Sequence, residues 1–264
     1  MTENPQSMFS DGAAYERLMG RWSKNAGEQF LDWLAAEKGL SWLDVGCGNG
    51  AFTEEIVSRC APASVSGIDP SEGQIAYART RPGTRMAEFH VGDSQALPFS
   101  DGSYDAATMA LVIAFVPDPA KGVAELARVL RPGGTAAAYM WDLPAMGVPL
   151  GPIYKALRDM DMPGPQPPSA EFSRREAMEA LWRGAGLDEV ETTVIRVPVS
   201  FDNFEDFWQS NTLPAGPHAK FVHAMPEAAR EELRRRLKDS LPTAADGRIA
   251  YESVANAVTG RKRR

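Results

Sequence analysis

Short apolar runs alternate with amphipathic segments through the first half of the chain. The runs are bounded by glycine, proline or aspartate and have the length of buried strands; they cover residues 40–45, 65–68, 90–91, 104–112 and 135–141. Between them, apolar positions at helical spacing predict helices over residues 15–37, 51–59, 71–81 and 120–130. This alternation predicts an α/β protein with a parallel sheet and helices on both faces.

The second half of the chain has a less regular pattern. Residues 144–168 are rich in proline, which predicts a loop or a broken helix pair. Helices are expected over residues 174–185, 204–210 and 226–241, and a strand is expected over residues 189–201. Residues 248–258 fit a helix better than a strand. The basic tail, residues 261–264, is expected to be a solvated, disordered end.

Composition narrows the class of protein. The chain has 28 basic and 35 acidic residues and a net charge of −7, which disfavours a non-specific nucleic-acid binder because that function needs a basic surface. The two cysteines, Cys47 and Cys60, are too few for a disulfide framework and fit a reducing compartment. The sequence shows no metal-binding cluster, signal peptide or membrane span. We therefore expect a cytoplasmic protein without a bound metal.

A glycine-rich string, LDVGCGNG at residues 43–50, follows the first predicted strand and leads into a predicted helix. Glycines let the backbone turn sharply and let a ligand approach it, and the helix start offers free N–H donors. Gly46, Gly48 and Ala51 also satisfy the permissive form of a dinucleotide-binding fingerprint. Asp44, placed before the first glycine, and Gly50 distinguish the string from that fingerprint.

Two acidic residues follow the next two predicted strands. Asp69 and Pro70 end the second strand, where a carboxylate can accept hydrogen bonds from ribose hydroxyls. The alternative is that Asp69 caps the following helix, although Ser71 suits that position. Asp93 and Ser94 follow the third strand in a segment that also reads as an ordinary turn.

Two more runs, residues 103–119 and 125–134, complete five motifs that follow one another in order. Together, residues 40–139 resemble the class I methyltransferases that use S-adenosylmethionine (SAM), and within them the type 11 group that includes quinone-biosynthesis enzymes. The resemblance implies a Rossmann-like, mostly parallel sheet of seven strands. It also implies SAM as cofactor, S-adenosylhomocysteine (SAH) as product and a small-molecule acceptor.

The resemblance implies roles for particular residues. In the family, the motif I acidic residue and glycine turn hold the methionine part of SAM, the second acidic residue holds the ribose, and the third holds the adenine amine. The cofactor-binding residues implied here are Asp44, Gly46, Cys47, Gly48, Gly50, Asp69, Pro70, Gln74, Asp93, Ser94 and Leu111. Tyr15 and Arg21 are further candidates in the N-terminal helix, where a guanidinium would match the SAM carboxylate. Gln74 occupies a position where relatives often have methionine.

The residues that act on the acceptor are less defined. Many relatives have a histidine where Ala114 and Phe115 stand, so the resemblance supplies no catalytic base. Weak candidates are His218, His223 and Asp142, the last at the end of the fifth strand. The aromatic residues near 204–225 suggest an apolar or planar acceptor, although core packing is the favoured interpretation for most of them.

These features predict one methyltransferase domain over residues 1–264. Its expected parts are an N-terminal helical cover (1–39), a SAM-binding core (40–142), a proline-rich loop (143–173) and a helical lid insertion (202–242) between the last two strands. Two alternatives stay open: a non-catalytic SAM-binding protein and, less favoured, an NAD(P)-dependent oxidoreductase. The sequence does not indicate the oligomeric state.

Overall fold

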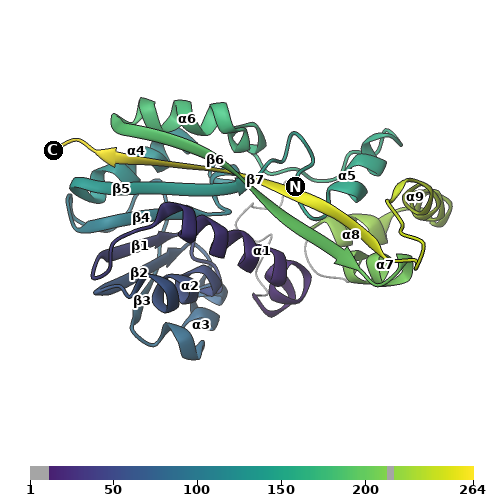
Figure 1. Cartoon of the computed structure of the whole chain (residues 1–264), viewed down its shortest axis with the longest axis horizontal. Helices are drawn as coiled ribbons and strands as arrows, with labels where there is room; N and C mark the ends of the chain where they lie inside the picture. The colour runs from purple at the N-terminus through teal and green to yellow at the C-terminus, as the bar shows by residue number, and fades with distance from the viewer. Residues whose placement is uncertain (1–11, 213–216) are drawn as a thin grey trace.

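The computed structural model describes residues 12–212 and 217–264, without the side chains of residues 12–19, 21 and 217. Within this part of the chain, one seven-stranded sheet has the order β3-β2-β1-β4-β5-β7-β6 (Figure 1). The strands are β1 (Ser41–Val45), β2 (Ser64–Asp69), β3 (Ala87–Val91), β4 (Tyr104–Ala110), β5 (Leu130–Trp141), β6 (Leu187–Phe201) and β7 (Ile249–Lys262). Strands β1 to β5 pair in parallel, and β7 is antiparallel to β5 and β6. The predicted Rossmann-like, mostly parallel sheet is confirmed.

Helices cover both faces of this sheet. On one side lie α1 (Gly12–Leu34) and α2 (Ala51–Cys60), with α3 (Glu72–Ala78) beside β3; on the other lie α4 (Pro119–Val129) and α6 (Arg175–Gly184). Because successive strand side chains point to opposite faces, β5 divides its residues between two cores. Tyr139 and Trp141 join the α1 side, whereas Met140 joins the α4 side. The Ser71 Oγ accepts a hydrogen bond from the Gln74 N–H at 3.4 Å and caps α3 as predicted.

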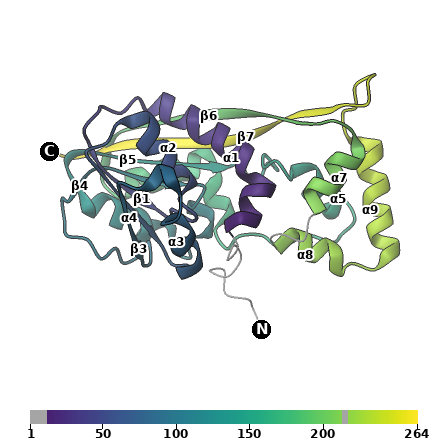
Figure 2. The same ribbon diagram turned by 90° about the horizontal axis from the view of Figure 1, so that it is seen from below.

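Strands β6 and β7 extend beyond the parallel strands and end in a group of helices (Figures 1 and 2). We call this group the distal lobe; it comprises α5 (Gly151–Arg158), α7 (Phe204–Thr212), α8 (Pro217–Ala224) and α9 (Glu227–Ser240). Helix α5 packs against α9, and the core on the α1 side continues into the lobe through the fully buried Ile153 and Leu237. The distal lobe therefore shares a core with the sheet.

Two expectations for the C-terminal segment are wrong. Residues 248–258 belong to strand β7, not to a helix, because β5 and β6 pair with this segment on both sides. The strand continues into the basic tail, where Arg261 pairs with Thr135. Lys262 Nζ also donates a hydrogen bond to the Arg128 carbonyl oxygen at 3.0 Å. The start of the tail is thus part of the sheet.

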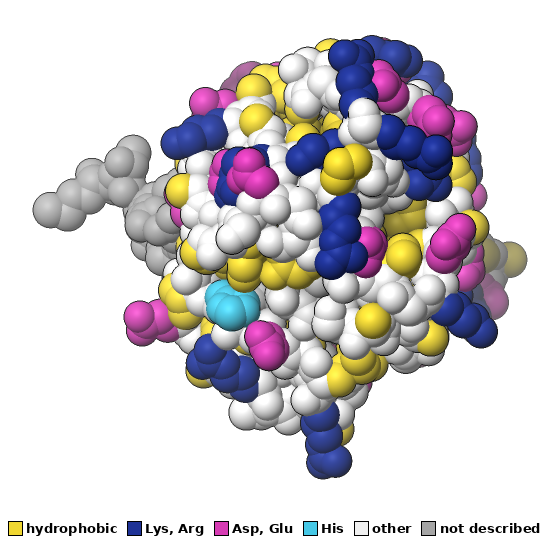
Figure 3. Space-filling view, turned by 90° about the vertical axis from the view of Figure 1, so that its left-hand side faces the viewer, with side chains coloured by type: hydrophobic (Ala, Val, Ile, Leu, Met, Phe, Trp, Pro, Cys, Tyr) yellow, Lys and Arg dark blue, Asp and Glu magenta, His cyan; other side chains and the backbone are white. Residues whose placement is uncertain are grey.

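The helices of the distal lobe refine the sequence expectations. Helix α5 lies inside the proline-rich segment, where the sequence predicts a loop or a broken helix pair, and α8 lies between the helices expected over residues 204–210 and 226–241. Within the described ranges, no helix has the length and apolar character that crossing a bilayer requires. On the face seen in Figure 3, acidic and basic side chains are interspersed.

Candidate active site

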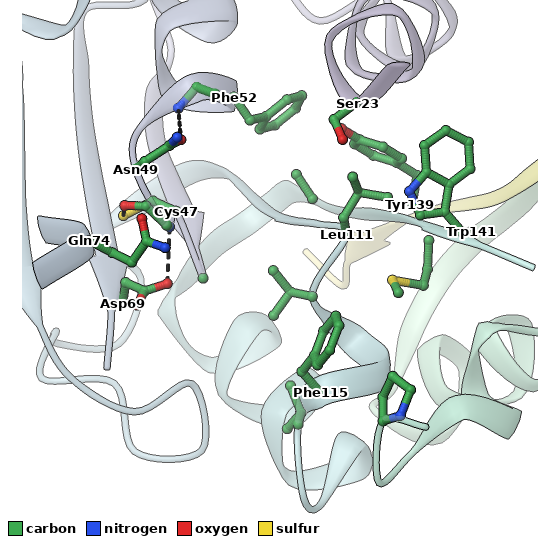
Figure 4. A pocket seen from close by; sticks show the side chains of 18 of the residues that line it. Ser23, Cys47, Asn49, Phe52, Asp69, Gln74, Leu111, Phe115, Tyr139 and Trp141 are labelled. Atoms are coloured by element: carbon green, nitrogen blue, oxygen red, sulfur yellow. Dashed lines mark hydrogen bonds between the residues drawn. The ribbon is translucent and has the colours of Figure 1, made fainter. Parts of the chain in front are cut away.

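A cavity of about 580 Å³ lies at the carboxyl ends of β1, β2, β4 and β5 (Figure 4). This is the edge at which open parallel sheets bind ligands, and β1, between β2 and β4, marks the point where the strand order reverses. The volume lies within the range of about 300–1,000 Å³ that is typical of small-molecule sites. The walls include residues of the sheet core and of the distal lobe, so both parts contribute to one site.

The glycine turn forms one end of this cavity. Gly46, Gly48 and Gly50 have φ values of +73°, +51° and +79°, a region that other residues rarely adopt. A Cβ on Gly46 would stand 2.4 Å from a methyl carbon of Val112, whereas a Cβ on Gly48 would meet no protein atom within 4 Å. The N–H groups of Gly46 and Cys47 donate to the Ile68 carbonyl oxygen at 2.7 and 3.0 Å. The turn is therefore held to β2 while its cavity side stays free of side chains.

Asp44 is a buried carboxylate beneath this turn. Its side chain is fully buried, and its Oδ2 accepts a hydrogen bond from Thr53 Oγ1 at 2.6 Å. Among the described residues, its Oδ1 has no hydrogen-bond partner. Burial, with a smaller contribution from the charge of Asp69, raises the pKa of Asp44 to about 7, although the Thr53 hydrogen bond lowers it. An ammonium group beside Oδ1 would supply the missing partner and stabilise the charged form.

Asp69 ties the end of β2 to the glycine turn. Its Oδ2 accepts a hydrogen bond from the Gly48 N–H at 3.0 Å, and its Oδ1 accepts one from the Ser71 N–H at 2.9 Å. Burial raises the pKa of this carboxyl group, and the two backbone hydrogen bonds lower it. Asp69 thus supports the loop before α3, as the alternative interpretation expected, and it also lines the cavity.

The third acidic position and the end of β4 complete this side of the cavity. Asp93 is exposed, and its Oδ1 accepts a hydrogen bond from the Gln95 N–H at 2.9 Å. Ser94 and the buried Gln74 also line the cavity. Leu111, just after β4, has a φ of +60°, and its N–H donates to the Tyr139 carbonyl oxygen at 2.8 Å. A leucine held in this conformation is unusual and is typical of functional sites.

The structure brings most of the predicted cofactor residues together. Those that line the cavity are Asp44, Gly46, Cys47, Gly48, Asp69, Pro70, Gln74, Asp93, Ser94 and Leu111. Gly50 does not line it and instead precedes α2, whose first N–H, that of Ala51, donates to Asn49 Oδ1 at 3.2 Å. The side chains of Tyr15 and Arg21 lie outside the described residues.

Of the three weak catalytic candidates, only His218 lines the cavity. His218 is buried in the cavity wall, and its ring Nε2 is 2.9 Å from the Asn211 carbonyl oxygen. Because a carbonyl oxygen only accepts, Nε2 carries the hydrogen and Nδ1 is the unprotonated nitrogen of the neutral ring. Burial lowers the pKa of His218, which favours this neutral form.

The other two candidates do not line the cavity. His223 is exposed, and its Nε2 is 2.7 Å from the Thr212 carbonyl oxygen. Asp142 accepts a hydrogen bond from the Ala145 N–H at 3.2 Å, in the turn that follows β5. Asp142 nevertheless lies between Trp141 and Leu143, which both line the cavity, and the catalytic roles of Asp142 and His223 stay predictions.

Several cavity residues carry no signal in the sequence. Ser23 and Gly27 come from α1, Tyr154 comes from α5, and Arg81 follows α3. The Nε of Arg81 donates to the Asn49 carbonyl oxygen at 2.7 Å, and Arg81 also forms an ion pair with Glu54 at 2.8 Å. Arg81 therefore supports the glycine turn from outside the recognised motifs.

Comparisons with known proteins agree with this geometry. Residues 43–138 match the family model described as "Methyltransferase domain". The chain is 30% identical over 175 residues to the demethylmenaquinone methyltransferase of Lactococcus lactis, a match that covers 58% of this chain and 68% of that enzyme. It is 32% identical over 156 residues to the ubiquinone/menaquinone biosynthesis C-methyltransferase UbiE of Geobacter sulfurreducens, which covers 54% of this chain and 59% of that enzyme.

Solved structures share the fold. A phosphoethanolamine N-methyltransferase 2 from Haemonchus contortus, in complex with SAM, has a TM-score of 0.56 and 19% sequence identity. That match covers 95% of this chain and 56% of the Haemonchus chain. The chain spans only 26% to 59% of the length of the first three curated relatives that it matches.

The sheet order and the glycine turn at its switch point define a class I methyltransferase fold. The similarity to the Lactococcus enzyme, at 30% identity over 68% of that enzyme, shows that the chain shares the family as well as the fold. The chain belongs to the SAM-dependent methyltransferase family, whose cofactor is SAM.

Proposed function

We propose that this protein transfers the methyl group of SAM to a small-molecule acceptor. The observation that supports it most is the unpartnered Oδ1 of the buried Asp44, which lies under a glycine turn at one end of a cavity that continues toward the distal lobe. A cofactor with an ammonium group suits that end, and an acceptor suits the other. When bound, SAM supplies an electrophilic methyl group on a positively charged sulfur.

Each residue of the cofactor end has a role in this proposal. Asp44 accepts hydrogen bonds from the ammonium group, and Asp69 accepts them from the ribose hydroxyls. Asp93 and Ser94 serve the adenine. The Ala51 N–H, the first of α2, donates to Asn49 Oδ1 at 3.2 Å, so the start of this helix is held at the glycine turn beside the cofactor end.

The rest of the cavity aligns the acceptor and excludes water. Leu111, Phe115 and Trp141 present apolar walls beside the cofactor end (Figure 4). Methyl transfer requires the acceptor atom to lie in line with the methyl–sulfur bond, so positioning and water exclusion account for most of what the protein must do. The relatives named above act on quinone precursors by name, which supports a ring-containing biosynthetic acceptor.

Calorimetric titration with SAH tests the cofactor assignment. We expect micromolar binding of SAH and no binding of NADH at the same concentrations. Tight NADH binding would favour the oxidoreductase alternative. SAH binding without methyl transfer to any of a broad panel of acceptors would favour the non-catalytic alternative.

A further inference from the structure

The two ends of the cavity differ in charge. Every charged residue that lines it lies between Lys24 and Asp93 in the sequence, and Lys24, on α1 next to Ser23, forms an ion pair with Glu55 at 3.4 Å. From Ser94 onward, the described lining residues include no aspartate, glutamate, lysine or arginine. Figure 4 shows the same division, with Asp69 and Gln74 at one end and Tyr139 and Trp141 at the other. An acceptor with a net charge would lose water at this second end without gaining a counter-charge, which is costly.

The uncharged end nevertheless offers polar atoms. We call this end the acceptor pocket; it is formed by Phe115, Trp141, Leu150, Tyr154 and His218. Trp141 is 3% exposed, and its Nε1 is buried without a hydrogen-bond partner among the described residues. In Figure 4 the indole nitrogen lies on the side of the ring that faces Tyr139 and Leu111. A buried N–H left unpaired is costly, so a ligand oxygen that accepts from it gains affinity.

Tyr154 and His218 add to this pattern. The Tyr154 hydroxyl makes no hydrogen bond to another described residue, and its ring lies 6.4 Å from the His218 ring between centroids. Burial raises the pKa of Tyr154 to about 12, so the hydroxyl keeps its hydrogen at neutral pH. With Nε2 of His218 bonded to Asn211, the ring leaves Nδ1 as an acceptor. The pocket therefore suits an uncharged ligand that carries an oxygen.

We propose that the methyl acceptor is an uncharged, aromatic molecule with at least one oxygen, and that the indole N–H of Trp141 selects for that oxygen. This specificity role deepens the proposed methyl transfer and rests on it. Trp141 acts by hydrogen bonding to the acceptor, and the apolar walls around it favour the ring. An acceptor with a phosphate or carboxylate at this end is disfavoured.

The test uses three naphthalene probes of similar size, titrated calorimetrically into the full chain saturated with SAH. They are 2-methoxynaphthalene, which has an acceptor oxygen, 2-ethylnaphthalene, which lacks it, and 2-naphthoate, which carries a charge. We expect the methoxy compound to bind about two-fold to ten-fold more tightly than the ethyl compound, the range that one neutral hydrogen bond supplies. We expect no binding of 2-naphthoate.

Trp141→Phe is expected to remove the preference for the methoxy compound and to leave SAH affinity unchanged. The matched control is Trp208→Phe, which alters an indole on α7 that does not line the cavity. If Trp141→Phe does not fold, the three affinities of the natural chain still decide the question. Equal binding of the methoxy and ethyl compounds, tightest binding of 2-naphthoate, or no binding of any probe while SAH binds would each overturn the proposal. Failure of SAH itself to bind would instead refute the proposed function.

Discussion

The two ends of the cavity are built in different ways. At the cofactor end, side chains come from the last residues of β1 and β2 and from the short segments that follow β1, β2 and β3, and three carboxylates, Asp44, Asp69 and Asp93, lie among them. At the acceptor pocket, side chains come from the turn after β4, from β5, from α5 with the residue before it, and from α8; these lie far apart in the chain, and the lining is uncharged. One end is thus specified by local turns, and the other depends on how the distal lobe packs against the sheet.

This difference implies that the two ends respond differently to substitution. A change at the cofactor end alters a turn that neighbouring residues hold by backbone hydrogen bonds, such as those from Gly46 and Cys47 to Ile68. A change in the acceptor pocket alters an apolar wall and leaves that turn intact. SAH affinity therefore reports on the first end, and probe selectivity reports on the second.

The largest effect is expected from Gly48→Val. The side chain would combine an unfavourable φ of +51° with methyl groups on the cavity side of the turn, so SAH binding should become undetectable by calorimetry. Gly247→Val is the matched control, because Gly247 has a φ of +86° and equally open surroundings but does not line the cavity. Both variants should lose roughly 1–2 kcal/mol of stability through backbone strain. Normal SAH binding by Gly48→Val would show that the cofactor lies elsewhere.

Asp44→Asn should have the next largest effect on SAH affinity. It removes a charged acceptor from a buried site, which corresponds to a loss of about 1.5–3 kcal/mol, or about 10-fold to 150-fold in Kd. Asp142→Asn changes a carboxylate that does not line the cavity and should bind SAH normally. An unchanged Kd for Asp44→Asn would show that Asp44 does not bind the ammonium group of the cofactor.

The cofactor end and the sheet topology are the parts that the sequence predicts best. LDVGCGNG at residues 43–50 predicts a strand, turn and helix because glycine conformations and strand ends are set by local geometry. The same kind of reasoning fails for β7, whose conformation depends on pairing with β5 and β6, both distant in sequence. It also misses Tyr154 and Arg81, because contacts made across the fold carry no local pattern.

Ionisation of Asp44 should also make the free energy of unfolding of the cofactor-free protein depend on pH. Its pKa of about 7 lies above the ordinary value of 3.8, so between these values the folded state keeps a proton that the unfolded state has released. Stability therefore falls as the pH rises through this window and levels off above pH 7. The contribution amounts to about 2 kcal/mol between pH 5.5 and 7.

Urea unfolding of the cofactor-free chain at pH 5.5 and pH 8 measures this contribution. Asp44→Asn should be more stable than the natural chain at pH 8 and should show a correspondingly smaller decline between the two pH values. Asp142→Asn serves again as the control. A decline of the same size in Asp44→Asn would assign the pH dependence to other groups.

The smallest effect is expected from Arg81→Gln, which tests whether the glycine turn needs support from outside its own motif. The substitution removes the 2.7 Å hydrogen bond from Nε to the Asn49 carbonyl oxygen and the ion pair with Glu54. We expect SAH to bind about two-fold to ten-fold more weakly, the size of effect that one hydrogen bond accounts for. Arg59→Gln breaks a pair with Asp32, at 2.6 Å on the outer side of α2, and should leave SAH affinity unchanged. If Arg81→Gln also binds SAH normally, the hydrogen bonds from the turn to β2 and Asp69 suffice to hold the turn. SAH affinity at the cofactor end would then depend only on residues within the sequence motifs.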